Sequence, residues 1–468
     1  MPAPLRIAAV LVLLGLAAPA AAADPAGHWE GAIELPNLAL TVKIDLEQAA
    51  DGAWHGTIDI PQQGAVGLEL VGFRVAADSV AFAIDGVPGA PTFRGLLAGD
   101  ALAGDFSQGG MTFPFRFGRE ALPAPQRPQE PQPPFPYTVQ EVGYASGDVH
   151  LAATLTVPAG DGPFPAAVLL TGSGPQNRDE ELFGHKPFAV LADHLTRRGF
   201  AVLRADDRGV GGSTGSTARS TTSDFADDAL AGVGFLRARP EIAPDRIGLI
   251  GHSEGGIVAP LAAVRAPEQV AFLVLLAGTG VPLGEVVKLQ QKLIMAAAGA
   301  DSSTIAREAE QNAVMLDLLA AGADSLTVRT RLEELLRTAA AGEGKPLPAD
   351  ELAATVDAAL AGVLTPWFRY ALTLDPRDAL RRVTCPVLAL NGDRDLQVDA
   401  DQNLVEIERA LAEAGNADVT ALRLPGLNHL FQQAVTGLPA EYGLIEQTMA
   451  PAVLDTVSGW LGERFLGR

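Results

Sequence analysis

The stretch that most constrains how this chain can fold is Asp245–Ile257. It reads as a short apolar strand, then a tight G-H-S-E-G turn at Gly251–Gly255, then a helix that begins at Ile257. A serine that stands out from a sheet edge in such a turn needs a strained backbone, so we expect a positive φ at Ser253. Glycines two residues before and after it leave room for the turn. The pattern predicts a serine nucleophile, with the amide end of the following helix beside it.

A serine in this kind of turn needs a histidine base, and the positions of the histidines in the sequence test whether one is available. In the α/β-hydrolases, whose nucleophile turn has this form, the acid and then the histidine follow the serine in the chain. The sequence holds seven histidines, and only His429 lies after Ser253. It lies in the loop 425–429, which leaves a predicted strand at 419–424. His429 is therefore the predicted base.

The acid is expected in the loop after the preceding strand, which we place at 385–390. The P-V-L…G-x-x-D-x-x-V pattern across residues 386–398 resembles the acid loop of the α/β-hydrolase family. The resemblance places the carboxylate at Asp395, and Asp393 is the nearest rival by position. It implies that Asp395 holds the correct tautomer of His429 and stabilises its charged form.

The same resemblance assigns the oxyanion donors. The loop 171–176 follows a predicted strand at 166–170 and contains Gly172-Ser173-Gly174. The family places its second oxyanion donor in such a loop, so the backbone N–H groups of Ser173 and Glu254 are the candidates, with Gly174 as the substitute for Ser173. The glycine-rich loop 206–213 lacks the Gly-Lys-Ser/Thr ending of a phosphate-binding loop. It is expected to support the nucleophile turn instead.

The chain divides into several parts. Residues 1–23 read as a secretory signal, with Arg6 before the apolar core Ile7–Leu16 and small residues before Asp24. The alternative is an uncleaved membrane anchor, but the apolar run is short for a span and no later run is longer than a strand. We therefore expect an exported protein, periplasmic or secreted, without a membrane span.

Residues 24–119 are predicted to form an all-β unit, a small antiparallel barrel or sandwich of six to eight strands. Leu38–Leu46 alternates strictly between apolar and polar residues, and turn signals such as Asp51-Gly52 separate the strands. Residues 120–136 are assigned to a linker, because seven prolines in Pro123–Pro136 favour a semi-rigid extended spacer.

Residues 137–280 and 381–468 are predicted to form an α/β domain, since strands alternate with helical stretches there. Such a domain has a mostly parallel, doubly wound sheet with catalytic residues at the carboxyl ends of its strands. Residues 281–380 contain helical patterns without strands, where family members carry a helical cap. Trp367 and Phe368 near its end either pack between helices or form the wall of a substrate pocket.

Composition excludes some classes of partner. The net charge is −22, with 34 basic and 56 acidic residues, which disfavours nucleic acid and anionic membrane surfaces as partners. The single cysteine, Cys385, allows no disulfide within the chain and is expected to be a core residue. No cluster has metal-ligand spacing, so neither a metal nor a cofactor is implied.

The resemblance covers about residues 137–468. In this region the chain is similar to bacterial exported serine carboxylesterases, with a secondary likeness to the serine aminopeptidase branch. The resemblance implies hydrolysis of a small-molecule ester through an acyl-enzyme. A serine aminopeptidase of the same fold is the alternative, and it would need cap carboxylates such as Glu333, Glu334 or Asp350 to hold an amine. A thioesterase or deacetylase, a non-catalytic binding protein and a homo-oligomer also stay open.

Overall fold

The computed structural model describes the chain in two compact units. The described residues are 24–35, 38–61, 65–87, 91–108, 111–121, 126–342 and 348–467. The expected secretory signal, residues 1–23, lies outside them. The first unit holds most of the chain up to Leu122, and the second contains Pro123–Arg468.

The first unit is a closed barrel of eight strands in chain order among the described residues. β1 closes the barrel by pairing antiparallel with β8. This confirms the predicted all-β unit. The strands are β1 (Gly27–Leu35), β2 (Leu38–Gln48), β3 (Trp54–Ile60), β4 (Ala65–Ala76), β5 (Ser79–Ile84), β6 (Thr92–Ala98), β7 (Ala101–Gln108) and β8 (Met111–Gly118).

Aromatic side chains fill the interior of the barrel. The ring of Phe93 is fully buried, and its centroid lies 4.8 Å from that of Phe106, 5.0 Å from Phe82 and 5.2 Å from Phe115. Because inward and outward side chains alternate along each strand, these rings converge from several neighbouring strands. The interior of the barrel is therefore a packed core.

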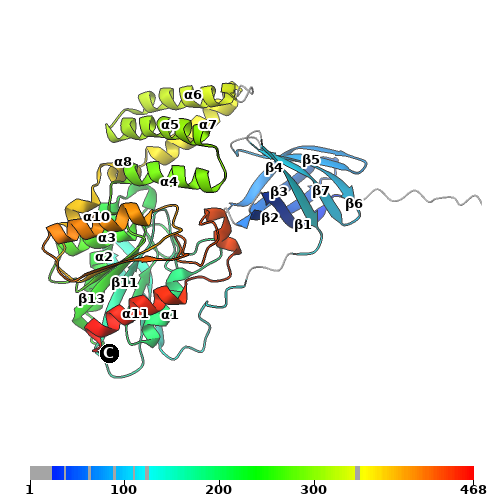
Figure 1. Cartoon of the computed structure of the whole chain (residues 1–468). Coiled ribbons are helices and arrows are strands. Elements are labelled where there is room, and N and C mark those ends of the chain that lie inside the picture. The colour runs from blue at the N-terminus through cyan, green and yellow to red at the C-terminus, as the bar shows by residue number, and fades with distance from the viewer. Residues whose placement is uncertain are drawn as a thin grey trace, which may run out of the picture. The chain divides into compact units, whose positions relative to one another are not determined.

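The second unit is built on a mostly parallel sheet, in the order β16-β15-β14-β13-β11-β12-β10-β9 (Figure 1). β10 runs antiparallel to β9 and to β12. The other six strands, β11 to β16, are parallel to one another. The bounds are β9 (Thr138–Ser146), β10 (Val149–Val157), β11 (Phe164–Leu170), β12 (Ala201–Ala205), β13 (Ile242–His252), β14 (Leu273–Leu276), β15 (Val387–Gly392) and β16 (Val419–Leu424).

Helices cover both faces of this sheet. Successive residues of a strand point to opposite faces, so apolar residues along each strand give both faces an apolar surface for helices to pack on. Leu249 belongs to the apolar cluster under α2 (Thr222–Arg237), α3 (Gly255–Arg265) and α10 (Ala400–Glu413). Ile250 belongs to the cluster under α1 (Pro187–Arg197) and α11 (Pro451–Phe465). The shorter helices are α9 (Pro376–Leu380), η2 (Thr217–Arg219) and η3 (Pro439–Leu444).

The stretch predicted to be a cap is helical. It contains α4 (Leu283–Ala297), α5 (Ser302–Ala320), α6 (Ser325–Gly342), α7 (Ala349–Val363) and α8 (Pro366–Thr373), which gather into a separate layer of helices in Figure 1. They share an apolar cluster of their own, which includes Leu316, Leu319, Val328, Leu352, Val356, Leu360 and Leu372.

The proline-rich segment is bound to the second unit from residue 126 onward, although its composition indicated a spacer. The guanidinium of Arg127 donates to the carbonyl oxygens of Gly443 (2.8 Å), Ile445 (3.0 Å) and Gly184 (3.0 Å). Gln129 donates to the carbonyl of Met449 at 2.7 Å. Because these carbonyls belong to loops distant in sequence, the segment ties those loops together.

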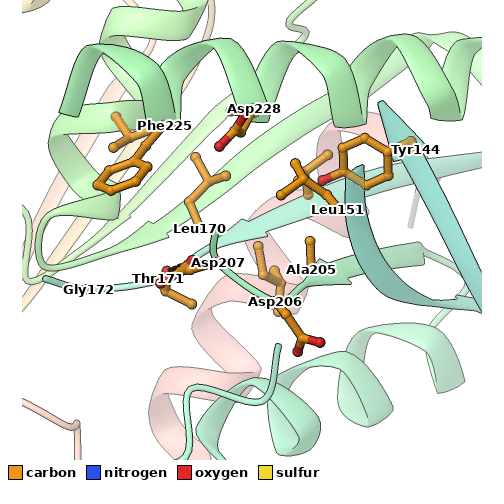
Figure 2. Close-up of a pocket in the computed structure, with 14 residues that line it drawn as sticks. Tyr144, Leu151, Leu170, Thr171, Gly172, Ala205, Asp206, Asp207, Phe225 and Asp228 are labelled. Carbon is orange, nitrogen blue, oxygen red and sulfur yellow. Dashed lines mark hydrogen bonds between the residues drawn. The ribbon is translucent and has the colours of Figure 1, made fainter. Parts of the chain in front are cut away.

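A small cavity of about 50 Å³ lies between the sheet and α2 (Figure 2). Asp207 lines it, and its carboxylate accepts hydrogen bonds from Thr171 Oγ1 (2.9 Å) and from the backbone N–H of Gln176 (2.8 Å). Burial raises the pKa of Asp207 to about 7, against an ordinary value of 3.8, although these two hydrogen bonds act in the opposite direction. The carboxyl group therefore titrates near neutral pH while it supports the loop that begins at Thr171.

We expect Asp207 to make the protein less stable as the pH rises from about 4 to about 7. The unfolded chain releases this proton near the ordinary pKa and the folded chain releases it only near pH 7, so the folded state binds more protons in between. The Asp207→Asn variant should remove this loss, which is worth up to roughly 4 kcal/mol. The measurement is the free energy of unfolding in urea between pH 4.5 and 7.5.

The matched control is Asp245→Asn, which neutralises an exposed aspartate on β13. Subtracting each variant's pH profile from that of the wild type removes the contribution of the other titrating groups. Parallel profiles for the wild type and Asp207→Asn would contradict the assignment.

Candidate active site

The nucleophile turn joins β13 to α3, and its backbone is crowded. Ser253 has φ 53°, as expected for this turn, and its N–H donates to the carbonyl of Leu276 at 2.9 Å. A Cβ added at Gly251 would lie 2.0 Å from the carbonyl oxygen of Gly255, and one added at Gly255 would lie 2.2 Å from that of Leu170. Only glycine therefore fits at positions 251 and 255, two residues before and two residues after this serine.

His429 and Asp395 lie against each other at the ends of neighbouring strands. His429 Nδ1 is 2.8 Å from Asp395 Oδ2, and both residues are buried. The other carboxylate oxygen, Oδ1, accepts from the backbone N–H groups of Gln397 (2.8 Å) and Val398 (2.9 Å). These bonds fix the carboxylate, so the imidazole that donates to it is oriented as well.

Asp393, the rival for the acid, is exposed and serves a different loop. Its Oδ1 accepts from the backbone N–H of Gly426 at 2.6 Å. The structure therefore brings Asp395, and not Asp393, to the imidazole of His429.

One cavity of about 120 Å³ collects most of the predicted site residues. Ser253, His429, Ser173, Glu254 and Trp367 all line it. Its other lining residues are mainly apolar, with a few polar ones: Thr222, Ile257, Thr279, Val281, Leu283, Val286, Gln290, Ala371, Leu374, Pro376, Gln397 and Val398.

Three predicted residues are not among those that line this cavity: Asp395, which lies behind His429, and Phe368 and Gly174. Phe368 packs against the apolar cluster of the cap. Successive residues of a helix point about 100° apart, so when Trp367 faces the cavity its neighbour on α8 faces elsewhere. Gly174 lies beyond Ser173 in its loop, with φ 90°. Of the two alternatives that the sequence left open, Trp367 lines the cavity and Phe368 packs between the helices of the cap.

A buried pair that sequence reasoning did not identify lies behind the nucleophile. His252 Nδ1 is 2.9 Å from Glu180 Oε1, and His252 Nε2 is 3.0 Å from the carbonyl oxygen of His429. A carboxylate and a carbonyl oxygen only accept, so these two contacts favour a ring with both nitrogens protonated. Burial lowers the pKa of His252, but the charge of Glu180, the hydrogen bonds to Glu180 and to the carbonyl of His429 and the charge of Asp395 together raise it.

Glu180 also reaches the predicted oxyanion loop. The same Oε1 accepts from the backbone N–H of Gly172 at 2.7 Å, next to Ser173. Glu180 has φ 50° and its side chain is 1 % exposed. The one sequence signal was its place in the polar run 176–180 directly after that loop.

The described part of the chain offers no metal site at this position or elsewhere. No group of three His, Cys, Asp or Glu side chains among the described residues is arranged to hold a metal ion. In the same residues, we find no helix whose length and apolarity would let it cross a membrane.

Part of the chain matches a known family and a known esterase. Residues 186–300 match the family described as serine aminopeptidase, S33. Esterase EstD of Thermotoga maritima is 27 % identical over 312 residues, which is 66 % of this chain and 65 % of the length of EstD. The chain thus spans about two thirds of that relative.

Solved structures of low sequence identity also match the chain. Est1E from Butyrivibrio proteoclasticus with bound ferulic acid is 17 % identical, with 70 % of this chain and 98 % of that chain covered and a TM-score of 0.41. The α/β hydrolase GrgF from Penicillium sp. sh18 is 15 % identical, with 71 % and 100 % covered and a TM-score of 0.44.

The fold implied by the sequence resemblance is confirmed. Ser253, Asp395 and His429 follow β13, β15 and β16, which are parallel, so all three lie at the carboxyl edge of one sheet. The chain has the α/β-hydrolase fold preceded by an all-β barrel, and its residues 186–300 match the serine aminopeptidase S33 family.

Proposed function

We propose that this protein hydrolyses carboxylic esters of small molecules by two-step acyl transfer, with Ser253 as nucleophile, His429 as base and Asp395 as acid. The observation that carries the proposal is the 2.8 Å contact between His429 Nδ1 and the fixed carboxylate of Asp395, in a histidine that lines the same cavity as Ser253. With Nδ1–H directed at the carboxylate, Nε2 is left as the acceptor for the serine proton.

The first step forms the acyl-enzyme. Ser253 Oγ attacks the ester carbonyl while His429 takes its proton, and the charged imidazole is stabilised by Asp395. The backbone N–H groups of Ser173 and Glu254 bind the oxyanion in this proposal, which is supported by the place of both residues in the cavity lining and of Glu254 before the first turn of α3. His429 then returns the proton to the leaving alcohol.

The second step releases the acid. A water molecule attacks the acyl-enzyme with His429 again as base, and Ser253 leaves with its proton restored. None of these steps uses a metal or another cofactor.

Ester hydrolysis is favoured over an aminopeptidase that holds its substrate through the cap. Three cap carboxylates were candidates to bind a substrate amine. Glu333 and Glu334 form ion pairs with Arg337 and Arg331 on α6 itself, and the side chain of Asp350 lies outside the described part of the chain. Neither glutamate lines the cavity. Thioesters and acetyl esters would undergo the same chemistry. Hydrolysis rates on a panel of esters, thioesters and acetyl esters distinguish these activities.

The Ser253→Ala variant should lose hydrolysis of p-nitrophenyl acetate by at least about a thousandfold in kcat, because the attacking oxygen is removed. Its thermal unfolding should match that of the wild type. Full activity in a folded Ser253→Ala protein would exclude Ser253 as the nucleophile.

The Asp395→Asn variant should reduce kcat by about ten thousandfold, since the amide no longer selects the tautomer or stabilises the imidazolium. Asp393→Asn is the matched control and should keep activity within a fewfold of the wild type. If Asp393→Asn were the more damaging change, the acid would be misassigned.

The predicted leader supports export, to the periplasm or the medium. Protein recovered from either fraction should begin near Asp24 when its amino terminus is sequenced. Recovery only in the cytoplasm with residues 1–23 attached would contradict export.

A further inference from the structure

The active-site cavity contains a carboxylate that the proposed acyl-transfer steps do not use. Glu254 contributes its backbone N–H to those steps, but its side chain also bonds to two residues that line the cavity with it, Thr222 and Trp367, and Glu254 is only 7 % exposed. Its Oε1 accepts from Thr222 Oγ1 on α2 (2.7 Å) and from Trp367 Nε1 on α8 (2.7 Å). Two neutral donors therefore hold the carboxylate at a defined place in the cavity.

No basic side chain compensates this carboxylate. The residues that line the cavity include no lysine or arginine, and His429, which is committed to Asp395, is the other ionisable group. Burial raises the pKa of Glu254, while the bonds from Thr222 and Trp367 lower it. A carboxylate in this setting gains from any cation that enters the cavity.

A second group in the cavity also lacks a partner. Thr279, in the segment between β14 and α4, is 7 % exposed and lines the cavity. Its hydroxyl oxygen is buried and has no hydrogen-bond partner among the described residues. Buried hydroxyls in folded proteins are normally paired, so an unpaired one on a cavity wall indicates a polar group that arrives with a ligand.

We propose that Glu254 and Thr279 form a subsite for a cationic, hydrogen-bond-donating group of the substrate, so that the preferred substrates are esters of ammonium-bearing acids or alcohols. The proposal rests on the ester hydrolysis proposed above. An ammonium group donates to both the carboxylate and the hydroxyl, while the apolar walls, such as Ile257 and Val286, contact the hydrocarbon next to it. The same carboxylate disfavours substrates with an anionic group.

Two pairs of isosteric esters test the subsite at pH 7. Alanine methyl ester and methyl isobutyrate place an ammonium or a methyl group on the acyl side. 2-(Dimethylamino)ethyl acetate, which is protonated at pH 7, and 3-methylbutyl acetate place a dimethylammonium or an isopropyl group on the alcohol side. Hydrolysis is followed by pH-stat titration, and each kcat/KM is divided by the rate constant for alkaline hydrolysis to remove differences in intrinsic reactivity.

The wild type should prefer the cationic member of at least one pair by about ten- to a hundredfold, the size expected for a hydrogen bond to a charged group. In Glu254→Gln this preference should fall at least tenfold, and in Thr279→Val it should fall a fewfold in the same pair. Glu285→Gln is the matched control, because it removes an acidic charge from α4 next to the cavity residue Val286. It should leave the preference within twofold of the wild type.

Equal rates within both pairs for the wild type would overturn the subsite while leaving Ser253-dependent hydrolysis intact. An equal fall for both members of a pair in Glu254→Gln would assign the side chain a structural role and also overturn it. Failure to hydrolyse any of the four esters, with Ser253→Ala no different from the wild type, would instead overturn the proposed function itself.

If Glu254→Gln does not fold, competition in the wild type decides. Butylammonium should inhibit hydrolysis of methyl isobutyrate at a concentration at least tenfold lower than 1-pentanol does. Equal or weaker inhibition by the amine would overturn the subsite.

Discussion

The backbone crowding around Ser253 is the constraint on which the rest of the site depends. A Cβ at Gly256 would lie 2.5 Å from the Cα of Gly278, just as one at Gly251 would press on Gly255. The nucleophile turn therefore contacts its neighbours backbone to backbone, with no side chain between them. This contact holds Ser253 at a positive φ, and the strain is maintained because several elements oppose its release.

The loops around this turn are joined by buried polar contacts between distant parts of the sequence. Glu180 contacts Gly172 in the loop after β11 and His252 before the nucleophile, and His252 contacts the backbone of His429. Because an unpaired charge at this depth is costly, each group fixes the position of the next. One network thus joins the turn at Ser253, the backbone of His429 and the loop that contains Ser173.

The sequence predicted the parts of the site that depend on local pattern. Ser253 could be found from its glycines, Asp395 from the resemblance of residues 386–398 to the family's acid loop and His429 because no other histidine follows the serine. Glu180 could not, since its partner His252 is 72 residues away and only the fold brings them together. The division between Trp367 and Phe368 likewise depends on the rotation of α8, which aromatic content alone does not reveal.

The packed barrel limits what the first unit can do. Since packed aromatic rings around Phe93 occupy its interior, this barrel does not enclose a ligand as wider barrels do. Any molecule that it recognises must meet its outer surface, where Leu96 and Met111 are exposed. Selection for recognition would then act on outward-facing residues, and these can vary without disturbing the core that holds the barrel together.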